Sequence, residues 1–436
     1  MRLRFFHASD GDCCLVSSGD LDGNGGVQHH ALVDGGRKGT FEDHARKAIA
    51  ELPRLDLVCV SHIDEDHIAG ILGLVGDEVA WRVHEFRKAE GLSTRKPRFP
   101  RPPAITEIWH NGLFALVGED LAPEVEGALE ATASLFAGSP DERVRDFASR
   151  MANLANGERS AMELSRRISD QQLGIAQNRP RGALMTREGA EEIEIGDLRF
   201  LMLGPTEDDI AKLREEWQTW LDGNAEALAG LQAEMLEDEG EMGLFQRLTR
   251  AHPRVAMALG DGAGSVTAPN LASLMFLVES GDMTVLLTGD GVSDAILEGL
   301  EHHDRLDSQG RLHVDVLKVQ HHGAEANVTG EFVRRITADH YVFCGNGAHE
   351  NPEEEVVRAF ALARLEGIGG EGPVGPDRPF RFHFTSSSKT KDLSDSRVAH
   401  LKKIEKRVKT LKEDHDPNGR LSSEAISKGA LTIELP

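Results

Sequence analysis

Apolar runs of strand length recur along the chain, and several of them end abruptly in histidine or aspartate. LDLVCV ends just before His62, VLLTG before Asp290, DVLKVQ before His321 and His322, and AITEIW before His110. Runs this rich in β-branched residues are typical of strands buried on both faces. Ligand and active sites in layered folds form where such strands end. The sequence therefore predicts an α/β fold with chemically active side chains gathered at strand ends.

Charge restricts the partners that we expect. The 436 residues include 73 Asp and Glu against 49 Lys and Arg, giving a formal net charge of −24. A surface this negative gives no broad attraction for polyanions, so general nucleic-acid coating and binding to anionic membranes are not expected. Any contact with single-stranded nucleic acid is expected at a local basic site.

Cysteine usage and the absence of long apolar runs predict a cytoplasmic protein. Cys13, Cys14, Cys59 and Cys344 form no CxxC pair and no disulfide framework, and we expect buried, reduced thiols. The opening MRLRFFHASDGDCCLV lacks an apolar signal core, and no segment reaches about 18 uninterrupted apolar residues. We therefore expect no membrane partner.

Two helical insertions interrupt the strand-rich pattern. Residues 123–177 are rich in Ala, Glu, Arg and Leu, and residues 207–250 form a second, very acidic helical stretch. The remainder, within 1–436, is expected to form one domain that closes with a basic helix and a strand at 386–436. The insertions either cover the active site or bind a protein partner or a second copy of the chain.

The densest group of ligand-type side chains lies in SHIDEDHIAG. His62, Asp64, Asp66 and His67 fall within six positions on one predicted turn after a buried strand. Imidazole and carboxylate groups suit Zn²⁺, Mn²⁺ or Fe, and alternate residues at a strand exit point the same way. A metal site is predicted here, with a solvated acidic loop as the alternative.

The order of the motifs VDGG, SHxDxDHxxG, LLTGD and DVLKVxHHG resembles the metallo-β-lactamase fold, most closely the ComEC-like branch of competence-protein hydrolases. FFHASDGDCCLV, APNLASLMFLVE and CGNGAHENPEEEVV resemble further segments of that branch. The segments that carry the resemblance are 2–81, 104–116, 192–206 and 268–364. The resemblance implies an αββα four-layer sandwich with a two-metal site at one edge.

The resemblance also implies the metal ligands. One ion is expected on His62, Asp64 and His110. The other is expected on Asp66, His67 and either His321 or His322, and the sequence leaves that choice open.

Three aspartates have further implied roles. Asp290 is expected to bridge the two ions, while Asp34 and Asp12 are expected to orient the ligands from behind. Asp64 stands where the commonest form of the motif has histidine. This carboxylate makes Mn²⁺ or Mg²⁺ more plausible relative to Zn²⁺ than an all-histidine site would.

The implied activity is hydrolysis by a water activated between two divalent ions, with Asp66 orienting or deprotonating that water. His349 either contacts the substrate and protonates the leaving group or caps the helix that starts near Pro352. The basic loop either binds substrate phosphates or is simply solvated; its members are Arg95, Lys96, Arg98 and Arg101.

Three functions remain open from the sequence. A phosphodiesterase or nuclease acting on single-stranded or small nucleotide substrates is favoured, because the ligand set is rich in carboxylates. A hydrolase of lactones or thioesters is the first alternative, since one fold hosts many chemistries. A non-catalytic scaffold that binds a protein partner is the second.

Overall fold

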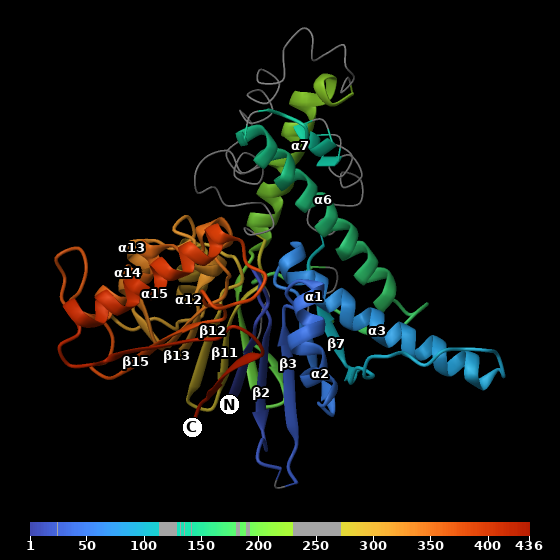
Figure 1. Ribbon diagram of the computed structural model, residues 1–436, viewed down its shortest axis with the longest axis horizontal. Helices are drawn as coiled ribbons and strands as arrows, with labels where there is room; N and C mark the ends of the chain where they lie inside the picture. Colours follow the sequence, from blue (N-terminus) through green and yellow to red (C-terminus); the bar gives the residue numbers. More distant parts are fainter. Residues whose placement is uncertain are drawn as a thin grey trace.

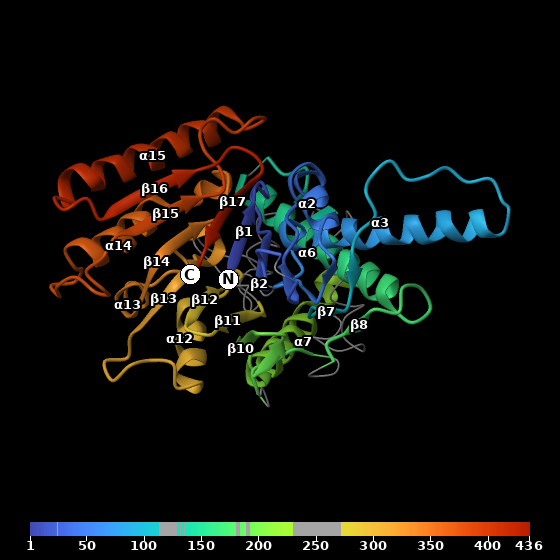
Figure 2. The same ribbon diagram turned by 90° about the horizontal axis from the view of Figure 1, so that it is seen from below.

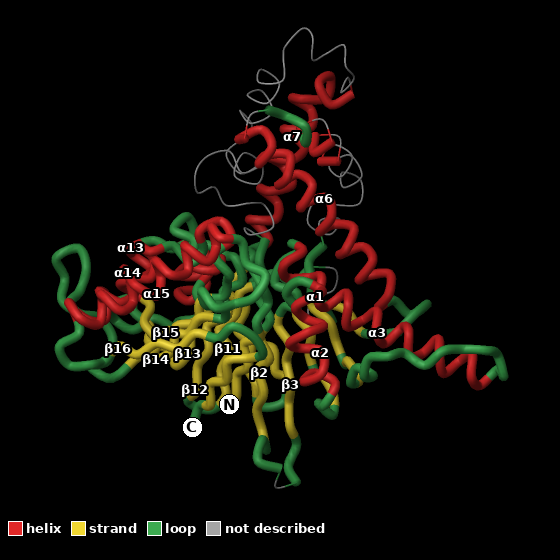
Figure 3. The backbone as a smooth tube through the Cα atoms, in the orientation of Figure 1, coloured by secondary structure: helices red, strands yellow, loops and turns green. Residues whose placement is uncertain are grey.

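Alternating apolar residues along short strands build two β-sheets in the computed structural model of the chain (Figures 1 and 3). It describes residues 1–23, 25–112, 129–130, 132–134, 136–140, 142–179, 184–188, 192–229 and 272–436. The predicted α/β class is confirmed in its general form, since strands and helices alternate along these residues.

The first sheet has seven strands, which in spatial order are β17 (Ala430–Glu434), β1 (Arg2–Phe6), β2 (Cys14–Gly19), β3 (Gln28–Val33), β5 (Leu57–Cys59), β7 (Glu107–Trp109) and β8 (Ala176–Gln177). Strands β3, β5, β7 and β8 run parallel, so their carboxyl ends share one edge. A separate parallel pair joins β4 (Arg54–Leu55) to β6 (Ala104–Ile105).

The second sheet has eight strands, which in spatial order are β16 (Leu421–Ala425), β15 (Phe380–Phe384), β14 (Ile336–Phe343), β13 (Leu312–Lys318), β12 (Met283–Leu287), β11 (Met275–Ser280), β10 (Leu198–Gly204) and β9 (Ile193–Ile195). The five strands from β12 to β16 run parallel. Strand β16 at the edge was not among the strands predicted from the sequence.

The helices described are α1 (Lys38–Thr40), α2 (Arg46–Ala50), α3 (Glu65–Ala89), α6 (Glu142–Ile168), α7 (Glu207–Ala229), α12 (Ser293–His302), α13 (Gly330–Arg335), α14 (Glu354–Leu365) and α15 (Asp395–His415). A π-helical turn at Phe41–Ala45 joins α1 to α2, and 3-10 turns lie at Gln320–Gly323 and Ala348–Glu350. In the part of the chain that the structure describes, no helix is long and apolar enough to cross a membrane.

Side chains on opposite faces of each strand enter different cores. On β1, Leu3 and Phe5 belong to a core shared by both sheets, whereas Phe6 packs with the helices on the outer face. On β13, Val316 enters the shared core and Leu317 the outer one. The two sheets therefore pack face to face. Because side chains alternate along a strand, every second residue enters the core between the sheets.

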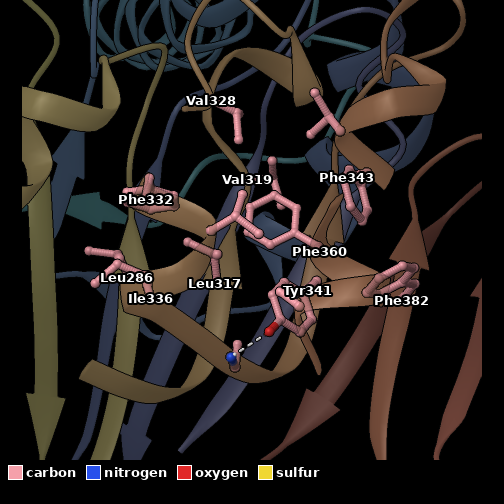
Figure 4. Packing of buried hydrophobic residues seen from close by; sticks show 14 of the residues in the cluster. Leu286, Leu317, Val319, Val328, Phe332, Ile336, Tyr341, Phe343, Phe360 and Phe382 are labelled. Atoms are coloured by element: carbon pink, nitrogen blue, oxygen red, sulfur yellow. Dashed lines mark hydrogen bonds between the residues drawn. The ribbon is translucent and has the colours of Figure 1, made fainter. Parts of the chain in front are cut away.

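Helices cover the outer face of each sheet. The seven-stranded sheet packs against α3 and α6, and the eight-stranded sheet against α12, α13, α14 and α15. Figures 1 and 2 show these two groups of helices on opposite sides of the paired sheets. Figure 4 shows the second outer core, where the Tyr341 hydroxyl accepts a hydrogen bond from the Ala338 backbone N–H at 2.9 Å.

Long helices lie within both predicted insertions. Helix α6 falls inside 123–177 and α7 inside 207–250, whereas residues 113–128 and 230–271 lie outside the described residues. Ser160 of α6 donates a hydrogen bond to Glu65 in the first turn of α3 at 2.6 Å. The first insertion therefore packs beside the segment that carries SHIDEDHIAG.

Candidate metal centre

Strand ends and one helix start bring the predicted ligands together. His62 follows β5, Asp290 follows β12, and His321 and His322 follow β13. The motif SHIDEDHIAG is split rather than held on one turn, because Asp64 is the residue before α3 and Asp66 lies in the first helical turn. Two sheets and one helix therefore supply a single cluster.

Close backbone packing fixes the start of α3 against the end of β3. A Cβ on Gly70 would lie 2.0 Å from the Gly35 carbonyl oxygen, and a Cβ on Gly11 would lie 1.7 Å from the Asp66 carbonyl oxygen. Only glycine permits approaches this close. These contacts fix the positions of Asp66 and His67 at the edge of the paired sheets.

Each of four histidines has its Nδ1 atom next to an oxygen of the surrounding chain. The partners are Ser61 Oγ at 3.1 Å for His62, Asp34 Oδ2 at 2.9 Å for His67, Asn327 Oδ1 at 2.7 Å for His321 and Asp12 Oδ1 at 3.3 Å for His322. Partners of this kind fix the ring orientation of metal-binding histidines and leave Nε2 for the ion. Asp34 hydrogen-bonds His67, whereas the Asp12 and His322 atoms lie side by side without a hydrogen bond, and the orienting roles of both aspartates stay predictions.

The four Nε2 atoms converge on the buried carboxylate of Asp290. They lie 3.6 Å from it for His62, His67 and His321, and 3.5 Å for His322. These separations exceed hydrogen-bond length. They are close to the roughly 3.3 Å that separates two ligands of one tetrahedral ion with bonds near 2.0 Å.

Buried polar atoms without a partner mark the same place. Among the described residues, the Nε2 atoms of His62, His67 and His322, and a carboxylate oxygen of both Asp64 and Asp290, are buried and accept or donate no hydrogen bond. Such orphaned groups are costly and need an explanation. A divalent ion would satisfy them, so the donor set fits a metal.

Both histidines of the HHG motif belong to the cluster, although in different positions. His322 is buried, and its Nε2 atom lies 3.6 Å from Asp66 Oδ2 as well as close to Asp290. His321 is 27% exposed at its side chain, and its Nε2 atom lies 3.6 Å from Asp290 Oδ2. Of the two candidates for the ion on Asp66 and His67, the geometry favours His322.

Backbone strain accompanies these ligands. His321 and His322 have φ values of 45° and 57°, and Asp34 has a φ of 59°. Left-handed conformations are uncommon outside glycine and cluster at functional sites. Gly289, with a φ of 49°, continues this pattern one residue before Asp290.

Burial and mutual contact shift the pKa values of the cluster. Burial, and then the nearby Asp66, raise the pKa of Asp64 to about 7. Burial and His67 lower the pKa of His62 to about 3. Burial alone would lower the pKa of His322, but the Asp290 and Asp12 carboxylates raise it to about 10. A divalent ion would therefore compete with a proton for the imidazole of His322.

Lys318 is a buried cation beside the centre that sequence reasoning missed. Its ammonium group pairs with Asp12, donates a hydrogen bond to the Gly289 carbonyl at 2.8 Å and lies 3.6 Å from Asp290 Oδ1. Burial would lower the pKa of Lys318, but Asp12 and Asp290 raise it. The sequence signal that could have identified Lys318 was a lone lysine inside the apolar run DVLKVQ.

His110 lies apart from these contacts. Its Nε2 atom is 2.9 Å from Gln177 Nε2 and 3.2 Å from Ser165 Oγ, and burial lowers its pKa to about 4. Among the described residues, no carboxylate or imidazole of the cluster lies within ligand-sharing distance of it. Its predicted ligand role is therefore not assembled by the structure.

Two other predicted groups are not among the contacts of the cluster in the described residues. His349 is exposed on the 3-10 turn at Ala348–Glu350, and the residue before α14 is Glu353, so the capping interpretation of His349 was wrong. The basic loop follows the far half of α3, where Arg101 binds Glu78 and Glu85. These positions are 13 and 20 residues beyond the start of α3, or roughly 20 to 30 Å along it.

In comparisons with known proteins, no family model matches the chain, and no curated protein sequence matches it. The fold and the candidate metal centre are therefore what indicate a function for this chain.

Proposed function

We propose that this protein is a metal-dependent hydrolase of the metallo-β-lactamase fold, acting on phosphodiesters. The motif order that resembles this family supports the proposal, together with two face-to-face sheets that carry helices outside. The single observation on which it rests is the convergence of four Nε2 atoms on Asp290.

The ligands divide between two positions. His62, with Asp64 at 3.9 Å and with His321 facing the same Asp290 oxygen, would hold one ion. Asp66, His67 and His322 would hold the other. Asp290 faces both groups and would bridge them. With several carboxylates beside the imidazoles, Zn²⁺ and Mn²⁺ both fit, and Mg²⁺ is the harder alternative.

Bound divalent ions would supply Lewis acidity and lower the pKa of a coordinated water. The chain itself positions the proton acceptor. Asp64 and Asp66 keep side-chain exposures of 25% and 21%, whereas Asp290 keeps 4%. Water entering the centre would therefore meet both Asp64 and Asp66. Asp66, which is held by the first turn of α3, would orient that water or take its proton.

Two features support a phosphodiester over a carboxylic substrate. The centre combines carboxylate and imidazole ligands, a hard donor set suited to ions that bind phosphate oxygens. Seven cations lie from Arg82 to Arg101, in the second half of the helix that carries Asp66 and in the chain that follows it, although the chain as a whole is strongly acidic.

Hydrolysis of bis-(p-nitrophenyl) phosphate by the full chain, with Mn²⁺ and Zn²⁺ supplied separately, tests the proposal. We expect metal-dependent turnover in the wild type and a loss of at least about 100-fold in Asp66→Ala, within the range for a general base. Arg358→Ala on α14 is the matched control, because Arg358 is exposed and pairs only with Glu355 among the described residues.

Two results would contradict the proposal. No turnover with metal demonstrably bound would redirect attention to lactones and thioesters. Failure to bind Mn²⁺ or Zn²⁺ at all would remove the metal centre and leave the scaffold interpretation.

A further inference from the structure

A strongly basic segment stands out on an acidic chain. Residues 82–101 carry seven Lys and Arg against two Glu, whereas the whole chain has a formal net charge of −24. Local inversion of charge on this scale attracts polyanions that the remainder of the surface repels. We call this segment the basic arm.

The basic arm is an ordered projection of the molecule. It consists of the second half of α3 and the chain that returns alongside it, which together extend beyond the sheets in Figure 2. The indole N–H of Trp81 donates to the Phe99 carbonyl at 3.3 Å, and the Lys96 ammonium lies 5.4 Å from the centre of the Trp81 ring. These contacts tie the returning chain to the helix.

Several cations of the arm are free to meet a ligand. Lys88, Arg95 and Arg98 are exposed and form no ion pair with any residue in the described ranges. By contrast, Arg82 and Arg101 are engaged by Glu78. Arg87 donates to the Ser93 carbonyl and Lys96 lies over the Trp81 ring, so Lys88, Arg95 and Arg98 are the cations of the arm with neither kind of contact to the described residues.

Exposed apolar side chains accompany these cations. Phe86, Val83 and Leu92 are 64%, 50% and 53% exposed, and they are three of the five large hydrophobic side chains exposed among the described residues. A phenylalanine ring beside lysine and arginine is the combination that binds single strands, because bases stack on the ring while cations follow the phosphates.

We propose that the basic arm binds single-stranded nucleic acid. This proposal extends the proposed function, because it specifies a polynucleotide as the phosphodiester substrate. That conclusion about the substrate rests on the proposed function. Asp66 and the arm share α3, so a strand lying on the arm would be tethered roughly 20 to 30 Å from the centre. The strand would reach the centre along the helix that carries the proton acceptor.

Binding of a fluorescent 20-residue oligothymidylate by the full chain, followed by fluorescence anisotropy in EDTA, tests the inference without hydrolysis. We expect Lys88→Gln/Arg95→Gln/Arg98→Gln to weaken binding at least tenfold. Loss of three phosphate contacts should reduce the slope of log K against log salt concentration by about 2. Phe86→Ala should weaken binding at least about fivefold, because it removes a stacking surface.

The matched control removes the same charge elsewhere. Lys402→Gln/Lys403→Gln/Lys406→Gln changes three exposed cations on α15 and should alter affinity less than twofold. Equal losses in both triple variants would overturn the inference, and so would absence of binding by the wild type at low salt. Arm-dependent binding to phosphatidylserine vesicles but not to the oligonucleotide would also overturn it in favour of a membrane surface.

The two proposals fail in different ways. Arm-dependent binding by a protein that hydrolyses no phosphodiester would support the arm and contradict the proposed function. Turnover of bis-(p-nitrophenyl) phosphate without arm-dependent binding would do the reverse.

Discussion

Asp290 is the residue on which the metal centre depends most. It faces the Nε2 atoms of His62, His67, His321 and His322, and no other carboxylate among the described residues contacts all four rings. Asp290→Ala should therefore lower the bound metal, measured by mass spectrometry of the dialysed protein, by at least half. Arg358→Ala serves as the control, and equal metal content in the two variants would contradict a bridging role.

Lys318 makes a separate prediction about stability. Lys318→Met leaves the buried Asp12 carboxylate without its cation, which should lower the free energy of unfolding by about 3 to 5 kcal/mol. Urea unfolding measures this change. Adding Asp12→Asn should recover part of the loss, since the unpaired charge is then gone. A single-variant cost below about 1 kcal/mol would show that Asp12 finds another partner.

Single residues show what could be predicted from the sequence and what could not. The proximity of His62, His67 and Asp290 could be predicted because metal chemistry restricts which side chains gather at a site and strand ends restrict where they lie. Their role as ligands stays a prediction. His110 has the same local signal, an apolar strand followed by histidine, yet its ring contacts Gln177 and Ser165. A local pattern does not specify which way such a ring turns.

At the scale of elements, the packing of α3 against β3 is a test of how the centre is held. Gly70→Ala places a Cβ against the Gly35 carbonyl and should lower the free energy of unfolding by roughly 1 to 3 kcal/mol, with weaker metal binding. Gly73→Ala, in the same helix, meets only Lys38 Cγ at 3.7 Å. Its higher helix propensity should raise stability by up to about 1 kcal/mol. Similar effects in both variants, by thermal unfolding and metal titration, would contradict this account.

The half-buried His340 and the buried His383 link β14 to β15 through a 2.9 Å contact between their rings and predict a pH dependence. Burial, and then His340, lower the pKa of His383 to about 3, against about 6.5 when unfolded. The unfolded chain therefore binds this proton first as the pH falls. Its contribution to stability is complete above about pH 6.5 and decreases towards pH 3 by about 1.4 kcal/mol per pH unit. Urea unfolding from pH 7.5 to 5 should give a flatter profile for His383→Gln, and parallel profiles would contradict the prediction.

Elements differed in how well the sequence predicted them. Strands such as LDLVCV and MTVLLTG were predicted because both faces are buried and their composition shows it. The full length of α3 was missed, since its outer half has few core contacts and carries exposed Val83 and Phe86 instead of a buried stripe. The edge strand β16, with the sequence LSSEA, lacks the apolar run that identifies a central strand.

At the scale of the whole molecule, β17 completes the seven-stranded sheet beside β1. Leu431 is buried in the core between the sheets, whereas the neighbouring Thr432 is exposed. Leu431→Ala should cost about 2 to 5 kcal/mol in the free energy of unfolding, and Thr432→Ala less than about 1 kcal/mol. Chemical unfolding of both variants measures these changes in the free energy of unfolding. Equal changes would show that β17 adds little to the shared core.

The sequence predicted the general fold class better than the arrangement of its parts. Apolar runs of strand length predicted the α/β class, which the structure confirms, whereas the four-layer sandwich that the resemblance implied stays a prediction. Sequence periodicity does not specify how insertions pack, because that depends on contacts such as Ser160 with Glu65 between segments far apart in the chain.

The pairing of β1 with β17 has a consequence for folding. Arg2 lies opposite Glu434 in this ladder, so the two strands meet across almost the entire length of the chain. Contacts at such sequence separation form late, because much of the chain must be ordered before they can close. During synthesis, the edge of β1 that pairs with β17 stays unpaired until some 430 further residues have been made. This unpaired edge is exposed to the edge-to-edge association that chaperones prevent.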